Sequence, residues 1–368
     1  MKIGYDGSRF FHNASGLGNY SRDLVRILSD YFPENEYLIF AHQPTDRGKE
    51  LLDRANVKSK KLSLIPLSRQ MGMGLDAQRE NCAIFHGLSG ELPLIWGPKS
   101  IKKIVTIHDL IFLKYPEFYF SLDVKTYTWK YKKAAEKADL VIAISEQTKK
   151  DVIQYFGIPE SKIKVIYQTC HHSFKEEFLP EDLENTQKKF NLPDEFLLSV
   201  GTIQERKNLL SVVQAIENEF IPLVVVGGEK KYAHKVYDYI REKGMENRVY
   251  FLKDVDMSEL AKIYRLAKIF IYPSLYEGFG IPVIEALFSK TPVITSNLSS
   301  LPEAGGPYST YVNPMDVADI RSKILNLWEN PAKRIEQTEQ SFEFVQRFNE
   351  ENIANDLMTA YRKVLSNA

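Results

Sequence analysis

The sequence is poor in cysteine and has no excess charge of either sign. Only Cys82 and Cys170 occur among its 368 residues, they lie far apart, and neither belongs to a CxxC or metal-ligand pattern. We therefore expect a reducing compartment and no disulfide framework. Lysine plus arginine and aspartate plus glutamate both number 48, so the net charge is zero. Because a nucleic-acid-binding protein carries a strong basic excess, we expect no nucleic-acid partner.

Long apolar runs are also missing. No stretch approaches the roughly 18 apolar residues that a membrane-spanning helix requires. No long apolar stretch follows the N-terminal MKIGYDGSRFF either, so we expect no signal peptide. These absences predict a soluble, cytoplasmic protein that at most rests on a membrane surface. The composition is 44% hydrophobic and 26% charged, as in ordinary globular enzymes, and the length suits two domains.

Short apolar runs alternate with segments of helical spacing along the whole chain. The runs are continuously apolar, which is typical of parallel strands covered by helices on both faces. The predicted fold class is therefore α/β, with two tandem Rossmann-like domains facing a cleft. The polar segment 171–196, which contains two prolines, is the candidate linker between them. The predicted strands span residues 2–6, 36–41, 61–65, 82–87, 103–109, 140–145 and 163–167 in the first half, and 196–201, 222–228, 248–253, 268–274 and 292–296 in the second.

Charged, glycine and histidine residues gather where these strands end, which is the edge at which α/β sheets bind ligands. His86 lies at the end of one strand, and His108 and Asp109 lie at the end of the next. Gly201 opens the segment GTIQERKN after the first strand of the second half, and the stretch SGLGNY follows the first strand of the chain. A purely structural protein would have little reason to cluster such residues there, so we take them as candidate site residues.

The stretch SLYEGFGIPVIEAL follows another apolar strand and is the most informative. Pro282 suits the first position of a helix, where its missing N–H costs nothing. The N–H groups of Phe279, Gly280 and Ile281 would then lie at a helix N-terminus, whose partial positive charge attracts phosphate. Gly278 and Gly280 would let the backbone approach a ligand closely. The stretch therefore predicts a phosphate-binding helix start.

Two glutamates flank this turn. Glu285 is expected in the first helical turn, where its carboxylate would reach a group beside the phosphates, such as the hydroxyls of a ribose. Glu277, on the entering loop, would lie on the other side of the phosphates. One carboxylate for each end of a nucleotide sugar is the functional interpretation. In the structural interpretation Glu285 only complements the helix dipole and Glu277 is solvated, and residue chemistry alone leaves both open.

This glutamate–seven residues–glutamate pattern resembles the signature of retaining glycosyltransferases with two Rossmann-like domains, the GT-B fold, in family 4. Five further stretches match that family in the expected order, so the resemblance spans essentially the whole chain. They are SGLGNY, VTIHDLIFLKYPE, AISEQTKKD, VGTIQERKNL and PVITSNLSSLPEAGG.

The resemblance implies roles for four residues of the second half. Lys207, helped by Arg206, is expected to bind the nucleotide diphosphate and to neutralise charge as it leaves. Glu277 is expected to contact the donor sugar, and Glu285 the ribose. Departure of a diphosphate builds negative charge, which fixed cations and backbone N–H groups stabilise.

It also implies roles for several glycines. Gly16 and Gly18 are expected to let the loop of the first domain close over the diphosphate, and Gly201 belongs to the donor site. Many relatives have an arginine directly after that strand-exit glycine. Here Thr202 occupies the position, which leaves Arg206 as the assigned arginine.

On the other half of the chain, His108 is expected near the reacting centre, hydrogen-bonded to a hydroxyl of the donor sugar. Asp109 and His86 are candidates for the acceptor side. The resemblance further implies domains at residues 1–175 for the acceptor and 176–347 for the nucleotide sugar, with a final helix at 348–368 packing on the first domain.

The activity implied is retaining, metal-independent transfer of a hexose, preferably mannosyl, from a nucleotide-diphosphate sugar to a glycan or glycolipid hydroxyl. The nucleotide sugar is a co-substrate, and no cofactor or metal is expected. A non-catalytic nucleotide-sugar sensor and an NAD-dependent oxidoreductase are the alternatives. For the latter the glycines at 16 and 18 stand too far beyond the strand. The acidic pair Asp254 and Asp256 looks like a metal motif, but helix capping is the favoured interpretation.

The segment 121–138 combines Tyr127, Trp129 and Tyr131 with Lys125, Lys130, Lys132 and Lys133. A basic, aromatic helix of this kind can lie on anionic lipid. A partly buried helix with a solvated lysine face is the favoured alternative. If the acceptor is lipid-linked, peripheral contact with the inner membrane face is expected through this segment.

Overall fold

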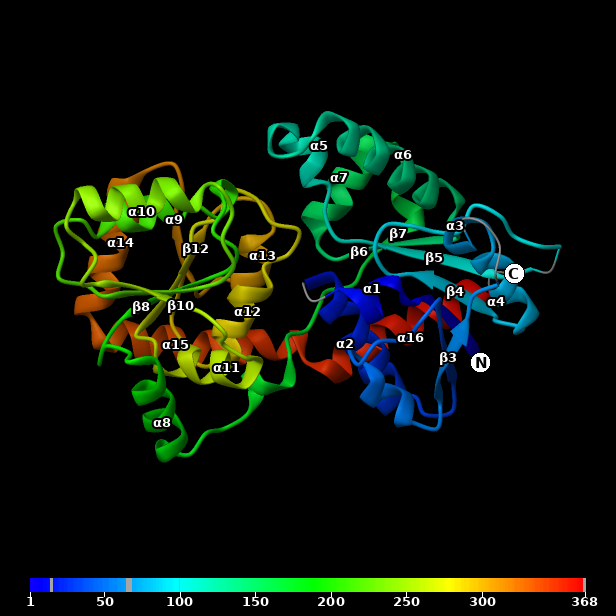
Figure 1. Ribbon diagram of the computed structural model, residues 1–368, viewed down its shortest axis with the longest axis horizontal. Coiled ribbons are helices and arrows are strands. Elements are labelled where there is room, and N and C mark those ends of the chain that lie inside the picture. The colour runs from blue at the N-terminus through cyan, green and yellow to red at the C-terminus, as the bar shows by residue number, and fades with distance from the viewer. Residues whose placement is uncertain (14–15, 64–67, 99, 367–368) are drawn as a thin grey trace. The chain divides into compact units, whose positions relative to one another are not determined.

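The computed structural model describes residues 1–13, 16–63, 68–98 and 100–366 (Figure 1). Contacts divide the chain into two compact units, of which the first comprises residues 1–168 and 349–368 and the second residues 169–348. The change of unit at residue 168 falls earlier than the position 175 expected from the sequence. The reason is Phe174, which is 1% exposed and packs edge-on against Tyr264 of the second unit at a ring distance of 5.5 Å.

The first unit is built on a seven-stranded sheet in which all pairs are parallel. Its strand order is β3-β2-β1-β4-β5-β6-β7, so the direction of winding reverses between β1 and β4. The strand expected at 61–65 is instead β3, which ends at Lys61, and residues 64 and 65 lie outside the described residues. The strands are β1 Lys2–Asp6, β2 Glu36–Ala41, β3 Val57–Lys61, β4 Ile84–Gly87, β5 Lys102–Ile107, β6 Leu140–Ala143 and β7 Ile163–Val165.

Helices cover both faces of this sheet (Figure 1). On one face α2 buries Leu24, Val25 and Leu28, which are spaced so that they share one side of the helix. On the other face α4, α6 and α7 bury a second apolar cluster. The helical segments are α1 Gly7–His12, α2 Gly16–Tyr31, η1 Lys49–Asp53, α3 Ser68–Met71, α4 Met73–Arg79, α5 Ile111–Lys114, η2 Pro116–Phe118, α6 Ser121–Lys137, α7 Glu146–Phe156, η3 Glu160–Lys162 and α16 Glu350–Ser366.

The C-terminal helix α16 fills the core of the first unit beside α2 (Figure 1). Its Leu357 and Tyr361 are at most 1% exposed. At its start, Glu350 accepts two hydrogen bonds from the guanidinium of Arg26 on α2, at 2.8 and 3.0 Å. Such a two-point contact between guanidinium and carboxylate fixes orientation as well as distance.

The second unit repeats the plan with a six-stranded parallel sheet of order β10-β9-β8-β11-β12-β13. The winding reverses between β8 and β11, as in the doubly wound dinucleotide-binding fold. The short strand β13 was not predicted from the sequence. The strands are β8 Leu197–Val200, β9 Leu223–Val226, β10 Val249–Leu252, β11 Ile269–Tyr272, β12 Val293–Ser296 and β13 Thr310–Val312.

The segment expected to be a linker is structured. It contains η4 and α8, both of which pack on α11. Asp256 caps α11 by accepting a hydrogen bond from the N–H of Glu259 at 2.8 Å, which agrees with the capping interpretation of that acidic pair. The helical segments are η4 His172–Lys175, α8 Pro180–Phe190, η5 Glu205–Lys207, α9 Leu209–Ala215, α10 Ala233–Glu242, α11 Met257–Leu266, α12 Ile281–Phe288, α13 Leu301–Gly305, α14 Val317–Glu329, α15 Pro331–Val345 and η6 Gln346–Phe348.

None of the helices within the described ranges combines the length and the apolar character that crossing a bilayer demands. Cys82 and Cys170 are both buried free thiols.

Candidate active site

The strongest cluster of candidate residues lies in the second unit, at the carboxyl ends of β8 and β11. These two strands are neighbours, and the winding of the sheet reverses between them. Doubly wound sheets bind ligands at this position, because the loops after the two strands diverge to opposite faces. The loop after β8 leads into η5 with Arg206 and Lys207, and the loop after β11 carries Glu277.

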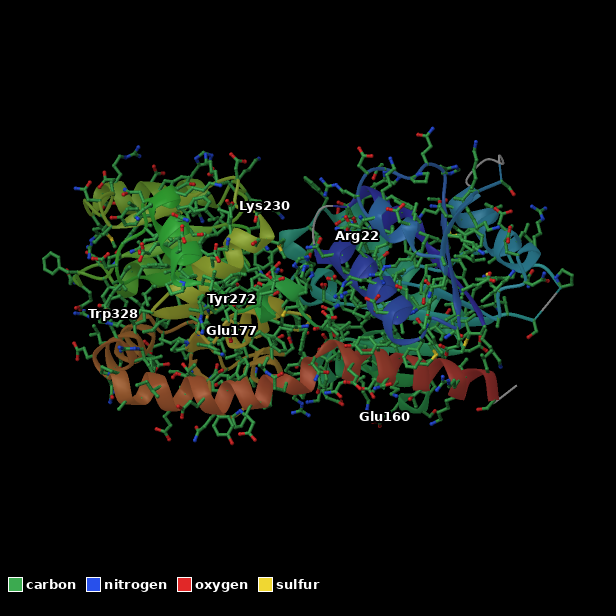
Figure 2. All side chains as sticks on the ribbon, turned by 90° about the horizontal axis from the view of Figure 1, so that it is seen from below. Arg22, Glu160, Glu177, Lys230, Tyr272 and Trp328 are labelled. Carbon is green, nitrogen blue, oxygen red and sulfur yellow. The ribbon has the colours of Figure 1, made fainter. Side chains whose placement is uncertain are left out.

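One oxygen of Glu277 collects four donors. Oε1 lies 2.6 Å from Nζ of Lys207 and 2.6 Å from Nη1 of Arg206. Two neutral side chains of the same strand exit complete the set, the Ser274 hydroxyl at 2.6 Å and the Tyr272 hydroxyl at 3.0 Å. Tyr272 (labelled in Figure 2) also accepts a hydrogen bond from Lys207, whose Nζ lies 4.6 Å from the centre of the tyrosine ring.

This surrounding keeps the Glu277 carboxylate charged although it is only 8% exposed. Burial by itself raises the pKa of Glu277, but the positive charges of Lys207 and Arg206 outweigh it and lower the pKa to about 2. At neutral pH the strand exit therefore carries one fixed anion and two cations in contact with it. An anionic group of a ligand could replace the Glu277 carboxylate as the partner of Lys207 and Arg206.

The loop that carries Glu277 is held by two serines. The hydroxyls of Ser299 and Ser300 donate to the backbone oxygen of Glu277 at 2.6 and 2.9 Å, and Ser300 also donates to that of Phe279 at 2.8 Å. Gly280 follows with φ of +126°, a conformation that side chains rarely adopt, and a Cβ there would meet Leu301 at 3.0 Å. Glycine at position 280 is thus required by the turn itself.

The helix after this turn begins one residue earlier than the proline indicated. α12 starts at Ile281, so Pro282 is its second residue, and Glu285 lies in the second turn rather than the first. Gly278 and Phe279 are both buried just before this start, and the Phe279 ring packs edge-on against Phe348 at 5.3 Å. The backbone groups expected to meet phosphate therefore do surround a helix start.

Glu285 lies in a different environment from Glu277. Its Oε2 accepts a hydrogen bond from the Tyr264 hydroxyl at 3.1 Å, and the residue is 7% exposed. Burial raises the pKa of Glu285 to about 7, although Tyr264 and the charge of Lys207 act in the opposite direction. The two glutamates therefore differ in their pKa values. At neutral pH Glu277 is charged, whereas Glu285 is close to half protonated.

Gly201, at the exit of β8, has φ of +135° and donates its N–H to the backbone oxygen of Val226 at 2.8 Å. A Cβ at this position would lie 3.8 Å from Cε of Lys207, so Gly201 forms part of the same cluster.

The first unit holds His108, directly after β5. Its ring nitrogens both have protein partners: Gln168 donates to Nδ1 at 3.0 Å, and Nε2 donates to the backbone oxygen of Leu88 at 2.8 Å. Burial lowers the pKa of His108 to about 4, so the ring is neutral at neutral pH. A ligand hydroxyl can bond to this ring only by replacing one of the two partners.

His86 is not placed for an acceptor, which corrects the expectation from the sequence. It lies within β4 and is fully buried, with Nδ1 at 2.7 Å from the Tyr361 hydroxyl and Nε2 at 2.8 Å from that of Thr106. Burial lowers its pKa to about 3. Both nitrogens are satisfied inside the core by residues of α16 and β5, so His86 has a structural role.

The prediction for two glycines of the first unit also needs revision. Gly16 and Gly18 lie in the first turn of α2 rather than in a loop, and Ser15 of the same stretch lies outside the described residues. A Cβ at Gly18 would come within 1.9 Å of the backbone oxygen of Asn13, whereas one at Gly16 would meet nothing. Local packing thus explains Gly18. Asp109 is half-buried and caps the turn after β5 by accepting from the N–H of Ile111 at 3.1 Å.

Four side chains that complete these sites were not predicted from the sequence. Tyr272 and Ser274 could have been found, because they stand in the same strand exit as Glu277. Tyr264 lies inside a helical pattern, and Gln168 lies in an irregular segment far along the chain from His108, so neither gave a signal. Within the described ranges, no three His, Cys, Asp or Glu side chains gather in a way that could hold a metal ion.

Comparisons with known proteins agree with this architecture. Residues 181–364 match the family described as Glycosyl transferases group 1, and residues 15–173 match Glycosyltransferase Family 4. The O-antigen chain mannosyltransferase B of Escherichia coli is 25% identical over 386 residues, covering 98% of this chain and 100% of that protein. The serotype-specific mannosyltransferase WbdA of Escherichia coli is 30% identical over 236 residues, covering 60% of this chain but only 28% of that longer protein.

Among solved structures, Anabaena Alr3699/HepE in complex with UDP-glucose superposes with a TM-score of 0.76 at 18% identity, covering 100% of each chain. At that identity the likeness shows the fold, which is GT-B. The two family matches together span the candidate residues of both units. This chain therefore belongs to the glycosyl transferases group 1, in family 4, and is a glycosyltransferase of the GT-B fold.

Proposed function

We propose that this glycosyltransferase transfers a hexose, preferably a mannosyl residue, from a nucleoside-diphosphate sugar to a hydroxyl of a glycan or lipid-linked glycan, with retention of configuration and without a metal ion. The observation that carries the proposal is the contact of Glu277 with Lys207 and Arg206 at the exit between β8 and β11. Two cations at this position suit a diphosphate, and a carboxylate held charged beside them suits the sugar that the diphosphate carries.

In the reaction, the bond between the sugar carbon and the diphosphate oxygen breaks, and its electron pair leaves with the diphosphate. Lys207 and Arg206 stabilise the negative charge that appears there, and Glu277 stabilises the positive charge on the sugar. The acceptor oxygen attacks from the face that the diphosphate leaves, and its proton passes to the leaving phosphate oxygen. No bond forms between sugar and protein, so trapping a covalent sugar adduct on Glu277 would contradict this route.

The preference for mannose comes from the relatives, because the two proteins named above are mannosyltransferases. The candidate donors are UDP- and GDP-sugars. A structural relative was solved in complex with UDP-glucose, and GDP-mannose is the alternative donor. Transfer assays with both donor types separate these alternatives.

The acceptor and the place of action belong to the same proposal. A glycan on a lipid carrier, at the cytoplasmic face of the inner membrane, fits relatives named for O-antigen synthesis. His108 and Asp109 are proposed to meet the donor sugar and the acceptor, respectively. Family membership leaves the NAD-dependent oxidoreductase without support. A non-catalytic sensor could afford to lose Lys207 and the two glutamates, Glu277 and Glu285, all of which this chain keeps.

The test is transfer from a panel of UDP- and GDP-sugars by the protein and by Lys207→Ala, each with and without a chelator. Loss of one charge-stabilising donor typically slows catalysis by roughly 100- to 1,000-fold, so Lys207→Ala should lose turnover while keeping its fold. Lys268→Ala is the matched control, because Lys268 also pairs with a glutamate, Glu195 at 2.7 Å, and lies over an aromatic ring, but away from the cluster. Unimpaired transfer by Lys207→Ala, or complete loss on chelation, would contradict the proposal.

A further inference from the structure

Only some of the aromatic side chains of the helix α6 pack against the core. Tyr127 and Tyr131 pack against the apolar cluster on the face of the sheet that α4, α6 and α7 cover, and the Tyr131 ring lies on Gly90. Trp129, by contrast, is 51% exposed. The helix therefore does not lie on a surface through all three aromatic residues.

The free side forms one continuous stripe at helical spacing, which we call the α6 stripe. Its exposed residues recur every three to four positions, so they share one side of the helix. Apart from Trp129, the stripe is mostly polar and basic. It consists of Leu122, Lys125, Thr126, Trp129, Lys132, Lys133, Glu136 and Lys137.

An apolar tip precedes the stripe. Residues 118–122, which we call the α6 tip, read Phe-Tyr-Phe-Ser-Leu and link η2 to α6. Phe120 is 83% exposed and Leu122 is 74% exposed, and Phe118 and Tyr119 are also exposed. Exposed single apolar residues are common, but four within five positions form a patch of the kind that marks an interaction site.

The positive charge of this region favours an anionic partner. Residues 111–138 contain six lysines and three acidic residues, a local net charge of +3 in a chain whose total is zero. Exposed phenylalanine and leucine beside lysines, with a tryptophan at the border, match the depth profile of a bilayer interface. Each lysine near an anionic lipid surface adds favourable binding energy, which a neutral protein surface would not supply.

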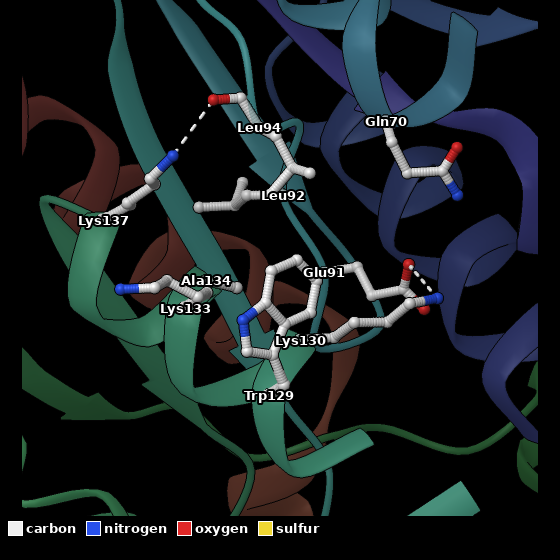
Figure 3. Close-up of a pocket in the computed structure, with 9 residues that line it drawn as sticks. All are labelled: Gln70, Glu91, Leu92, Leu94, Trp129, Lys130, Lys133, Ala134 and Lys137. Atoms are coloured by element: carbon white, nitrogen blue, oxygen red, sulfur yellow. Dashed lines mark hydrogen bonds and ion pairs between the residues drawn. The ribbon is translucent and has the colours of Figure 1, made fainter. Parts of the chain in front are cut away.

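The pocket beside the stripe argues against a small soluble ligand. It is lined by Leu92, Leu94 and Ala134 with Trp129 across it, and Lys130, Lys133 and Lys137 stand around it (Figure 3). Its volume is only about 30 Å³, far below what a sugar or nucleotide occupies. The ammonium groups of Lys130 and Lys137 are held in place by Glu91 at 3.5 Å and the backbone oxygen of Leu94 at 3.0 Å (Figure 3).

We propose that the α6 tip inserts into the interface of an anionic phospholipid bilayer and that the lysines of the α6 stripe contact its phosphates. The contact deepens the proposed function, because it would bring the enzyme to a lipid-linked acceptor, but it does not depend on which sugar is transferred. The tip enters the lipid, and the helix behind it stays anchored in the core through Tyr127 and Tyr131.

The test is partitioning of the full chain onto phosphatidylcholine vesicles with and without phosphatidylglycerol, measured by co-sedimentation. Phe120→Ser/Leu122→Ser removes the apolar tip and should lower partitioning at least tenfold. The matched control is Leu179→Ser/Phe220→Ser, which removes two apolar side chains that are similarly exposed on the second unit. Each lysine of the stripe replaced by glutamine should weaken partitioning about fivefold.

Trp129 supplies an independent signal. Its emission should shift to the blue on vesicles that contain phosphatidylglycerol, and Trp129→Phe should abolish the shift. The proposal would be overturned if partitioning were the same with and without phosphatidylglycerol. It would also be overturned if the tip variant partitioned as strongly as the unchanged protein. A concentration-dependent dimer in sedimentation velocity that only the tip variant loses would also overturn it, in favour of a second copy. Transfer to a water-soluble acceptor should be unchanged in the tip variant, so loss of membrane binding and failure of the proposed transfer are distinguishable.

Discussion

Replacing Glu277 by glutamine should tighten the binding of UDP or GDP while abolishing sugar transfer. In the free protein, the carboxylate lies 2.6 Å from both Lys207 and Arg206 and serves as their counter-ion. A nucleoside diphosphate brings its own negative charge to the same two cations, so the glutamate opposes its binding. Glutamine keeps the shape of the side chain and removes that opposition. Transfer is lost nevertheless, because the developing charge on the sugar has no carboxylate beside it.

The pKa of Glu277 sets the size of the effect. A fall from 4.5 to about 2 corresponds to roughly 3 kcal/mol in favour of the charged form, at about 1.4 kcal/mol per pKa unit. If a diphosphate recovers about half of this interaction in the variant, its dissociation constant falls roughly tenfold. The same interaction stabilises the free protein above about pH 4.5 and is lost as the pH falls through about 2. The variant without nucleotide should therefore unfold at a lower temperature at pH 7.

Isothermal titration with UDP and GDP measures the affinity, and a transfer assay with the best donor measures activity. Glu195→Gln is the control, because Glu195 pairs with Lys268 at 2.7 Å on the surface of the same unit, where such a pair contributes little. Weaker or unchanged nucleotide binding by Glu277→Gln would show that the diphosphate does not meet these two cations.

Two further predictions concern single positions. Burial raises the pKa of Glu285 to about 7, above the unfolded value, so the protein without nucleotide should lose stability as the pH rises from about 4.5 to 7. Glu285→Gln should remove this loss, which thermal unfolding at pH 5 and pH 8 would detect, and an equal pH dependence in both proteins would refute it. Gly18→Ala should lower the melting temperature, because its Cβ would come within 1.9 Å of the Asn13 oxygen, whereas Gly16→Ala should be tolerated. Equal melting temperatures for the two alanine variants would contradict this packing argument.

The fold class follows from the sequence because parallel strands covered on both faces are apolar throughout. β9 (Leu223–Val226) and β11 (Ile269–Tyr272) are of this kind. The exception is β3, Val57–Lys61, whose sequence VKSKK has a single apolar residue because it lies at the edge of its sheet. An apolar pattern cannot reveal such a strand. β13 is also at an edge, and with three residues it is too short to form a recognisable pattern.

The residues of the candidate site likewise include some that the sequence predicts well and one that it does not. Lys207 and Glu277 were found because each follows a strand that the pattern reveals, and neighbouring parallel strands bring their exits together. His86 was misjudged because it also stands near a strand end, while its partner Tyr361 lies 275 residues further along the chain. Only the packing of α16 into the first unit makes that histidine a core residue. Local sequence contains nothing that reports such a contact.

The use of both chain ends in the first unit has a consequence for biosynthesis. Residues 1–168 leave the ribosome without α16, whose Leu357 and Tyr361 fill their core and whose Tyr361 is the partner of His86. The second unit is contiguous and can close as soon as residue 348 has emerged. During translation the core of the first unit therefore stays incomplete until the residues of α16 have emerged.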